Sequence, residues 1–125
     1  MAVGTRQDAY VGSPWGLYAS DSTGKPAGAV TTTVRTLTRG PTALAANTWV
    51  HLAVTDDGTT LRLYVADVQV ASTPAAGAIS VSPGAMRIGG NDVFGEWFQG
   101  LVDEVHVYNR ALTPAEVTAD STFRV

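Results

Sequence analysis

Short runs of alternating side chains, each closed by turn-forming residues, are the feature that most constrains the fold of this chain. Residues 28–39 carry β-branched side chains at most second positions, from Val30 to Thr38. Such a period of two places successive side chains on opposite faces of an extended strand. Turn signals such as Asp57-Gly58 recur at spacings of roughly ten residues. This pattern predicts about eight to ten strands in an all-β fold, an antiparallel two-sheet β-sandwich.

The expected strands follow directly from these runs. They cover residues 15–20, 28–39, 49–55, 61–66, 68–73, 79–81, 85–89 and 100–108, with one further short strand near 8–11. The strands at 49–55, 61–66 and 68–73 are expected to form a three-stranded meander, because Asp57-Gly58 favours a tight hairpin turn between the first two. Residues 94–98, Phe-Gly-Glu-Trp-Phe, are expected to form an aromatic loop.

The clearest strand leads into the clearest helix start, within residues 98–117. Alternation in 100–108 places two sets of side chains on opposite faces: Leu101, Asp103, Val105 and Val107 on one, and Val102, Glu104, His106 and Tyr108 on the other. Thr113, Pro114 and Glu116 then supply an N-cap, a first-turn proline and a capping-box acid. A short C-terminal helix is expected to begin there.

Composition and charge exclude several classes of protein. The 125 residues are 45% hydrophobic and 15% charged, which suits a single domain, 1–125, with its own core. The net charge is −3 and the eight basic residues are spread along the chain, so no nucleic-acid partner is expected. Without cysteine, neither a disulfide nor a thiolate metal site can form. No apolar run reaches the roughly 20 residues that membrane insertion needs.

An ordered set of motifs carries a family resemblance. These are Trp49-Val-His-Leu-Ala-Val-Thr, Asp57-Gly58, Leu61-Arg-Leu-Tyr-Val, Val70-Ala-Ser, Arg87-Ile-Gly-Gly-Asn, and the run from Gly100 to Glu116. In this order they resemble the laminin-G-like domains of the concanavalin A-like lectin/glucanase superfamily, as found in exported bacterial proteins. The resemblance extends over residues 15–120 and is most specific over 49–116.

The resemblance implies a jelly-roll sandwich that is extracellular or on the cell surface. Relatives usually have some sixty or more further N-terminal residues whose strands enter both sheets, so this chain is expected to be a truncated version. Unpaired sheet edges would then favour self-association or pairing with a complementary chain. The alternative is that residues 1–14 replace the missing strands. Relatives also usually have Asn-Gly where this chain has Ala66-Asp67, which predicts a turn of another type or a bulge.

A hydrolase activity is not expected, although the superfamily includes glycoside hydrolases. Retaining hydrolysis needs two carboxyl groups about 5 Å apart on the same face. Asp103 and Glu104 are adjacent and so point to opposite faces of their strand, and the family's Glu-x-Asp pattern followed by Glu is absent. His106 is expected to pair with Glu104, two residues away, and His51 to be a packed structural residue. These observations predict a noncatalytic protein.

Candidate ligand-binding residues are the aromatic side chains and their polar neighbours. Sugar rings stack on exposed aromatic rings, while nearby polar groups bind their hydroxyls. The candidates are Phe94, Glu96, Trp97, Asn91, Trp15 and Tyr18, with Phe98 and Gln99 beside them. The alternative for each aromatic residue is a place in the core.

Calcium is the one cofactor that the sequence suggests. Asn91, Asp92 and Asp21 carry oxygen ligands of the kind that calcium takes, in loops. The alternative is that these three residues are ordinary turn residues bonding to the nearby backbone.

Two functions therefore follow from the sequence. The first is a noncatalytic recognition module of a larger exported bacterial protein, serving carbohydrate binding or adhesion. The second is a structural or assembly module that binds another polypeptide, or itself, through exposed sheet edges and has no sugar site. The partner is accordingly a glycan or another protein.

Overall fold

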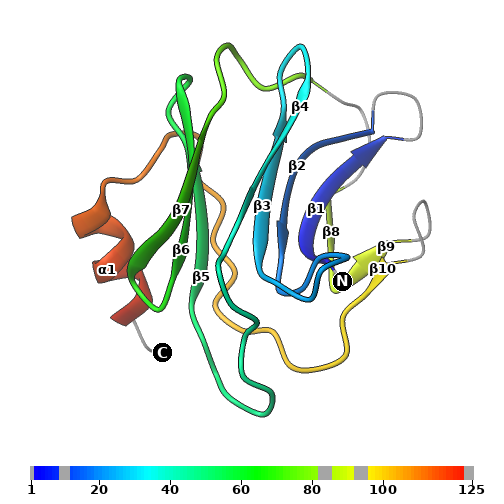
Figure 1. The fold of residues 1–125 in the computed structure, drawn as a ribbon, viewed down its shortest axis with the longest axis vertical. Coiled ribbons are helices and arrows are strands. Elements are labelled where there is room, and N and C mark those ends of the chain that lie inside the picture. The colour runs from blue at the N-terminus through cyan, green and yellow to red at the C-terminus, as the bar shows by residue number, and fades with distance from the viewer. Residues whose placement is uncertain (1, 9–11, 82–85, 92–95, 123–125) are drawn as a thin grey trace.

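The computed structural model describes residues 2–8, 12–81, 86–91 and 96–122. One short helix and a set of mostly short strands make up this part of the chain (Figure 1). The elements are β1 (Ala2–Asp8), β2 (Gly12–Tyr18), β3 (Ala27–Thr31), β4 (Arg35–Arg39), β5 (Leu52–Asp56), β6 (Thr60–Val65), β7 (Val68–Pro74), β8 (Met86–Ile88), β9 (Gly90–Asn91), β10 (Glu96–Trp97) and α1 (Pro114–Thr122).

The strands form two main antiparallel sheets that face each other. One sheet has the order β4-β3-β2-β1-β8, the other is the meander β5-β6-β7, and β9 and β10 form a separate pair. Helix α1 lies on the outer side of the three-stranded sheet (Figure 1). The prediction of an all-β antiparallel sandwich with one short C-terminal helix is confirmed.

The core lies where β3 and β4 face β6 and β7. Leu61 and Leu63 are fully buried there, and Val30 packs with Leu61 and Ala75. Tyr64, on the opposite face of β6, and Val117, on α1, are buried on the helix side of the smaller sheet. The two sheets approach closely at Gly28, because a Cβ atom there would lie 2.4 Å from Cγ2 of Val54. Glycine is therefore required at this position, where any larger side chain would push the sheets apart.

The prediction of one long strand over residues 28–39 is wrong. The chain turns at residues 32–34, where the Thr32 N–H donates to the Val34 carbonyl, and β3 and β4 pair as a hairpin. Unbroken β-branched alternation hides this turn, because it contains none of the glycine, proline or asparagine residues that usually mark one.

Of the two alternatives expected at the turn between β6 and β7, the turn of another type does not occur, while the bulge is present as a register shift. Ala66 and Asp67 both have positive φ, 50° and 73°. These signs belong to a type I′ turn, which matches the twist of the paired strands even though the residues disfavour it. The meander persists as predicted, and the pairing shifts register between Leu63 and Tyr64.

Helix α1 begins as the sequence predicts. The Thr113 hydroxyl accepts from the Glu116 N–H at 3.2 Å, and the Glu116 carboxylate accepts from the Thr113 N–H at 3.0 Å. This reciprocal pair is a capping box. In the described part of the chain, no helix is long and apolar enough to cross a membrane.

The expected strand over residues 100–108 does not form, which is the largest departure from the sequence prediction. These residues form no ladder with a described strand, and Glu104 has a φ of 52°, in the left-handed region. Its N–H donates to the Asp103 side chain instead. A residue in this conformation interrupts an extended strand, so the segment runs beside β5 without pairing to it.

Smaller differences affect the edges of both sheets. β1 spans Ala2–Asp8, whereas the first short strand was expected near residues 8–11. Residues 9–11 lie outside the described part. Residues 79–81 are not a strand, and residues 96 and 97 form β10 in place of a loop. β5 begins at Leu52, so Trp49 precedes it and is 67% exposed.

Candidate functional site

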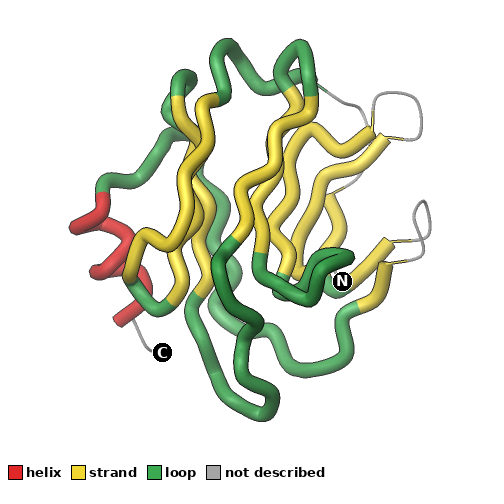
Figure 2. Tube along the Cα trace, in the orientation of Figure 1, coloured by secondary structure: helices red, strands yellow, loops and turns green. Residues whose placement is uncertain are grey.

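The two sheets have unequal numbers of strands, and this inequality creates the candidate site. β4 faces β7, β3 faces β6, and β2 meets β5. β1 and β8 have no comparable contact with the three-stranded sheet. The sandwich is therefore closed on the β4–β7 side and open on the side of β8 and β5 (Figure 2).

A groove of about 1150 Å³ occupies the open side, between the inner face of the larger sheet and β5. Residues 98–110 run along it, and its lining is mostly apolar. The apolar lining includes Trp15, Leu17, Val30, Trp49, Leu52, Val54, Ile79, Met86, Ile88, Leu101, Val105 and Val107. Several of these side chains are open to solvent, with Leu101 77% exposed and Ile88 47% exposed. Contiguous exposed apolar surface of this kind marks interaction sites.

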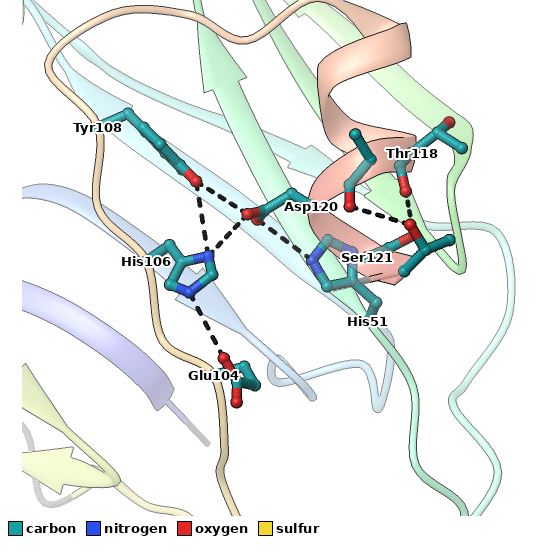
Figure 3. Close-up of polar contacts among 9 residues, drawn as sticks. His51, Glu104, His106, Tyr108, Thr118, Asp120 and Ser121 are labelled. Carbon is teal, nitrogen blue, oxygen red and sulfur yellow. Dashed lines mark hydrogen bonds and ion pairs between the residues drawn. The ribbon is translucent and has the colours of Figure 1, made fainter. Parts of the chain in front are cut away.

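A polar cluster around Asp120 forms part of the groove wall (Figure 3). Asp120 lies on α1, and His51 lies immediately before β5. His106 and Tyr108 lie on the segment 100–108, which was expected to be a strand. The Tyr108 hydroxyl donates to Asp120 Oδ1 at 2.8 Å, and His106 Nδ1 lies 2.7 Å from the same oxygen. His51 Nε2 lies 3.7 Å from Asp120 Oδ2. One carboxylate thus joins three segments that are distant in sequence.

The expected pairing of His106 with Glu104 is confirmed. His106 Nε2 lies 3.6 Å from Glu104 Oε2, so its imidazole stands between two carboxylates (Figure 3). The pairing survives the loss of the strand because both side chains still reach the same side of the segment.

The electrostatics of the cluster centre on the Asp120 carboxylate. Burial raises its pKa, but the hydrogen bonds from Tyr108 and His106 outweigh burial and hold the pKa below its ordinary value. The same hydrogen bond to Asp120 raises the pKa of the Tyr108 hydroxyl. Asp120 is therefore a charged acceptor that fixes its neighbours in place. Among the described residues, no group of three His, Cys, Asp or Glu side chains is arranged to hold a metal ion.

Only part of the predicted ligand set can be placed. Trp15 is half-buried and lines the groove, as do Phe98 and Gln99. Tyr18 is only 6% exposed, in the core with Ala27 and Ala29, so it presents no ring face to a ligand in this structure. The backbones of Asn91, Glu96 and Trp97 lie in the β9–β10 pair. Phe94 and Asp92 lie outside the described residues.

The predicted calcium residue Asp21 has the geometry of a turn-forming aspartate. Its Oδ1 accepts from the Thr23 N–H at 2.8 Å, the Thr23 hydroxyl at 2.6 Å and the Lys25 N–H at 3.3 Å, and its Oδ2 pairs with Arg39. Burial raises its pKa, but these hydrogen bonds lower it far more. A calcium ion at Asp21 would have to displace Arg39.

Two residues of the site escaped the sequence prediction. Asp120 lies in α1 and belongs to no sequence motif. Its position in the predicted capped helix is the one sequence signal that could have placed it near His51. Trp49 was placed in a strand, but it lies exposed ahead of β5. The residues before a strand carry no signal of how the chain enters the sheet.

Together, the two antiparallel sheets and the short C-terminal helix define a β-sandwich of the concanavalin A-like class. A laminin G family model, described as the concanavalin A-like lectin/glucanases superfamily, matches residues 2–118, and the chain belongs to this family. No curated protein matches the chain.

A solved structure supports the fold assignment. It is the S-layer domain-containing protein (residues 221–444) from Clostridium thermocellum, with a TM-score of 0.53 and 21% identity. The match covers 86% of this chain and 56% of that chain, so this chain spans little more than half its length. At this identity the likeness concerns the fold alone.

Proposed function

We propose that this chain is a noncatalytic recognition module of an exported or cell-surface protein, and that its groove binds an extended segment of another polypeptide. The observation that carries this proposal is the open side of the sandwich. There the three-stranded sheet does not cover the inner face of the larger sheet, and apolar side chains such as Met86 and Ile88 remain about half exposed. Adhesion or assembly is the role that such a surface serves.

The edge of β5 favours a strand as the ligand. Among the described strands β5 pairs only with β6, so its other edge has no strand partner and is the kind of edge to which another strand can pair. A strand added to a sheet edge gains main-chain hydrogen bonds, and pockets for its alternate side chains give specificity. The apolar groove next to β5 supplies such pockets for one face of an added strand.

Charge along the groove favours a partner with basic residues. Four acidic residues line it, Asp56, Asp103, Glu104 and Asp120, against Arg110. The Arg110 guanidinium already pairs with Glu116, at 2.8 Å between Nη1 and Oε1. A strand with alternating apolar residues and a flanking Lys or Arg therefore matches the groove in both shape and charge.

Display selection of short peptides against the chain tests this function. Enriched peptides should alternate apolar residues and carry Lys or Arg. Ile88→Lys should weaken their binding more than about tenfold, because burying an isoleucine is worth about 1.5–3 kcal/mol. The matched control is Val34→Lys, an equally apolar exposed residue at the β3–β4 turn and 64% exposed.

The outcome of this comparison is decisive. Equal loss in the two variants, or no enriched peptide, would contradict polypeptide binding at the groove. Light scattering on the same proteins tests whether the partner is a second copy of this chain. Dimers that form in the wild type and dissociate in Ile88→Lys would identify it as such.

Glycan binding is a second candidate, favoured by Trp49. This indole is 67% exposed and lines the groove, so a sugar ring could stack on it. A glycan array with and without a chelator tests sugar and calcium together, calcium being proposed at Asn91, Asp92 or Asp21. Binding lost in Trp49→Ala or Trp97→Ala, with folding intact, supports a glycan site. Silence in both conditions argues against it.

The proposed location rests on relatives. The laminin G family suggests a surface or extracellular protein. Detection of the native protein on intact cells by surface labelling tests this location.

A further inference from the structure

We infer that the Asp120 cluster is a pH-sensitive latch, in which a second proton on His106 fastens residues 100–108 to helix α1. The chain has only two histidines and no cysteine, and both histidines lie against the same carboxylate (Figure 3). Histidine is the side chain whose charge ordinarily changes between about pH 5 and 8. Side-chain titration near neutral pH is therefore concentrated in this one cluster. The latch belongs to the fold and does not depend on what the groove binds.

Asp120 supplies the fixed charge of the latch. Its Oδ1 accepts from the Tyr108 hydroxyl at 2.8 Å and lies 2.7 Å from His106 Nδ1. Burial raises the pKa of Asp120, but these hydrogen bonds outweigh burial and hold the pKa below its ordinary value. Asp120 is therefore ionised whenever His106 gains or loses a proton.

The imidazole of His106 stands between two carboxylates. A neutral imidazole carries one N–H, and the short contact with an ionised oxygen places that proton on Nδ1. Nε2 then presents a lone pair toward Glu104 Oε2, 3.6 Å away. A second proton, on Nε2, converts this contact into an ion pair that joins Glu104 to Asp120. The two carboxylate side chains are 31% and 17% exposed, so solvent screens their charges only in part.

His51 has a different environment from His106. Its Nε2 lies 3.7 Å from Asp120 Oδ2, but its Nδ1 is buried without a hydrogen-bond partner among the described residues. A second proton there would create a buried N–H donor with nothing to accept it, which is costly. The pH response therefore belongs to His106.

The other titratable and charged groups around the cluster keep their charge in this range. They come from every element packed there: Asp103, Tyr108 and Arg110 on the segment that carries His106, Glu116 on α1, and Tyr64 on the helix side of β6. Arg110 pairs with Glu116, and the Tyr108 hydroxyl donates to Asp120. Aspartate, glutamate, tyrosine and arginine side chains ordinarily titrate outside the range from about pH 5 to 8.

Urea unfolding between about pH 5 and 8, where histidine titrates, tests the latch. The folded chain holds the second proton of His106 between two carboxylates and the unfolded chain does not, so folded stability should fall as pH rises. We expect the unfolding equilibrium constant to rise about threefold across this range, as for a partly exposed ion pair. His106→Asn keeps a donor at the Nδ1 position but cannot take up a second proton, so it should lose this dependence.

Two further variants separate His106 from its neighbours. His51→Gln is the matched control, because it keeps a donor at the Nε2 position facing Asp120 and should retain the wild-type pH dependence. Glu104→Gln should weaken the dependence although His106 is intact. Full dependence in His106→Asn, or its loss in His51→Gln, would overturn the assignment to His106.

The wild type alone provides a second check. Stability that does not fall as pH rises would overturn the latch itself. If His106→Asn does not fold, an NMR titration of the wild type decides the question. The amide signals of Glu104 and Asp120 should shift together with the His106 ring signals, at one midpoint. Different midpoints, or no shift at either amide, would contradict a proton shared between the two carboxylates.

Discussion

Single residues hold this sandwich together at positions where their conformation matters more than their chemistry. Gly28 permits the close approach of β3 to Val54 in the opposite sheet. Ala66 and Asp67 adopt positive φ in the β6–β7 turn. At Gly28 the packing of the two sheets leaves no room for a side chain, whereas at the turn the pairing of β6 with β7 imposes a backbone that the local residues disfavour.

The β6–β7 turn gives a direct prediction at this scale. Replacing Ala66-Asp67 by Asn-Gly should raise the free energy of unfolding by about 1 kcal/mol, because Asn and Gly adopt positive φ at lower cost. The change also removes Asp67 Oδ1, a buried atom without a hydrogen-bond partner. Urea unfolding measures the effect.

A converse variant checks the same reasoning. Asn47 has a φ of 57°, so Asn47→Ala should lower the free energy of unfolding. If the Asn-Gly variant is less stable than the wild type, the turn does not have the conformation described.

Helix α1 is the element whose stability depends most clearly on pH. The bond from Arg110 and the capping bonds from Thr113 lower the pKa of Glu116 from its ordinary 4.5 to about 2. Because the folded-state pKa is depressed, this stabilisation is fully present above pH 4.5 and is lost as pH falls through about 2. Urea unfolding at a series of acid pH values should show this loss.

Substitution of the capping acid separates its contribution from general acid unfolding. Glu116→Gln should be less stable than the wild type above pH 4.5 and should approach it near pH 2. Glu104→Gln, which also replaces a carboxylate by an amide but leaves the capping box intact, is the control. Identical profiles for the two variants would show that Glu116 does not support the helix.

The sequence predicts those elements whose signals are local. The Thr113–Glu116 capping box and the Asp57-Gly58 turn both form as expected, because each depends on neighbours a few residues apart. The predictions of one long strand over 28–39 and of a strand over 100–108 were wrong for another reason. Alternation shows that a segment can be a strand, but not where it turns or whether an edge is available for pairing.

At the scale of the whole molecule, the same limit applies to the site. Trp15 could be proposed from its sequence because an aromatic residue on a strand is a natural candidate, and it lines the groove. The Asp120 cluster could not, because it joins His51 to His106 across 55 residues of chain. The groove itself follows from unequal sheets, which no single segment encodes.

Amide exchange along the three-stranded sheet, with and without a selected peptide, tests the central claim most directly. We predict that the bound peptide slows exchange in β5 and leaves the opposite edge, β7, unchanged. Slowed exchange at β7, or at neither edge, would contradict strand binding in the groove.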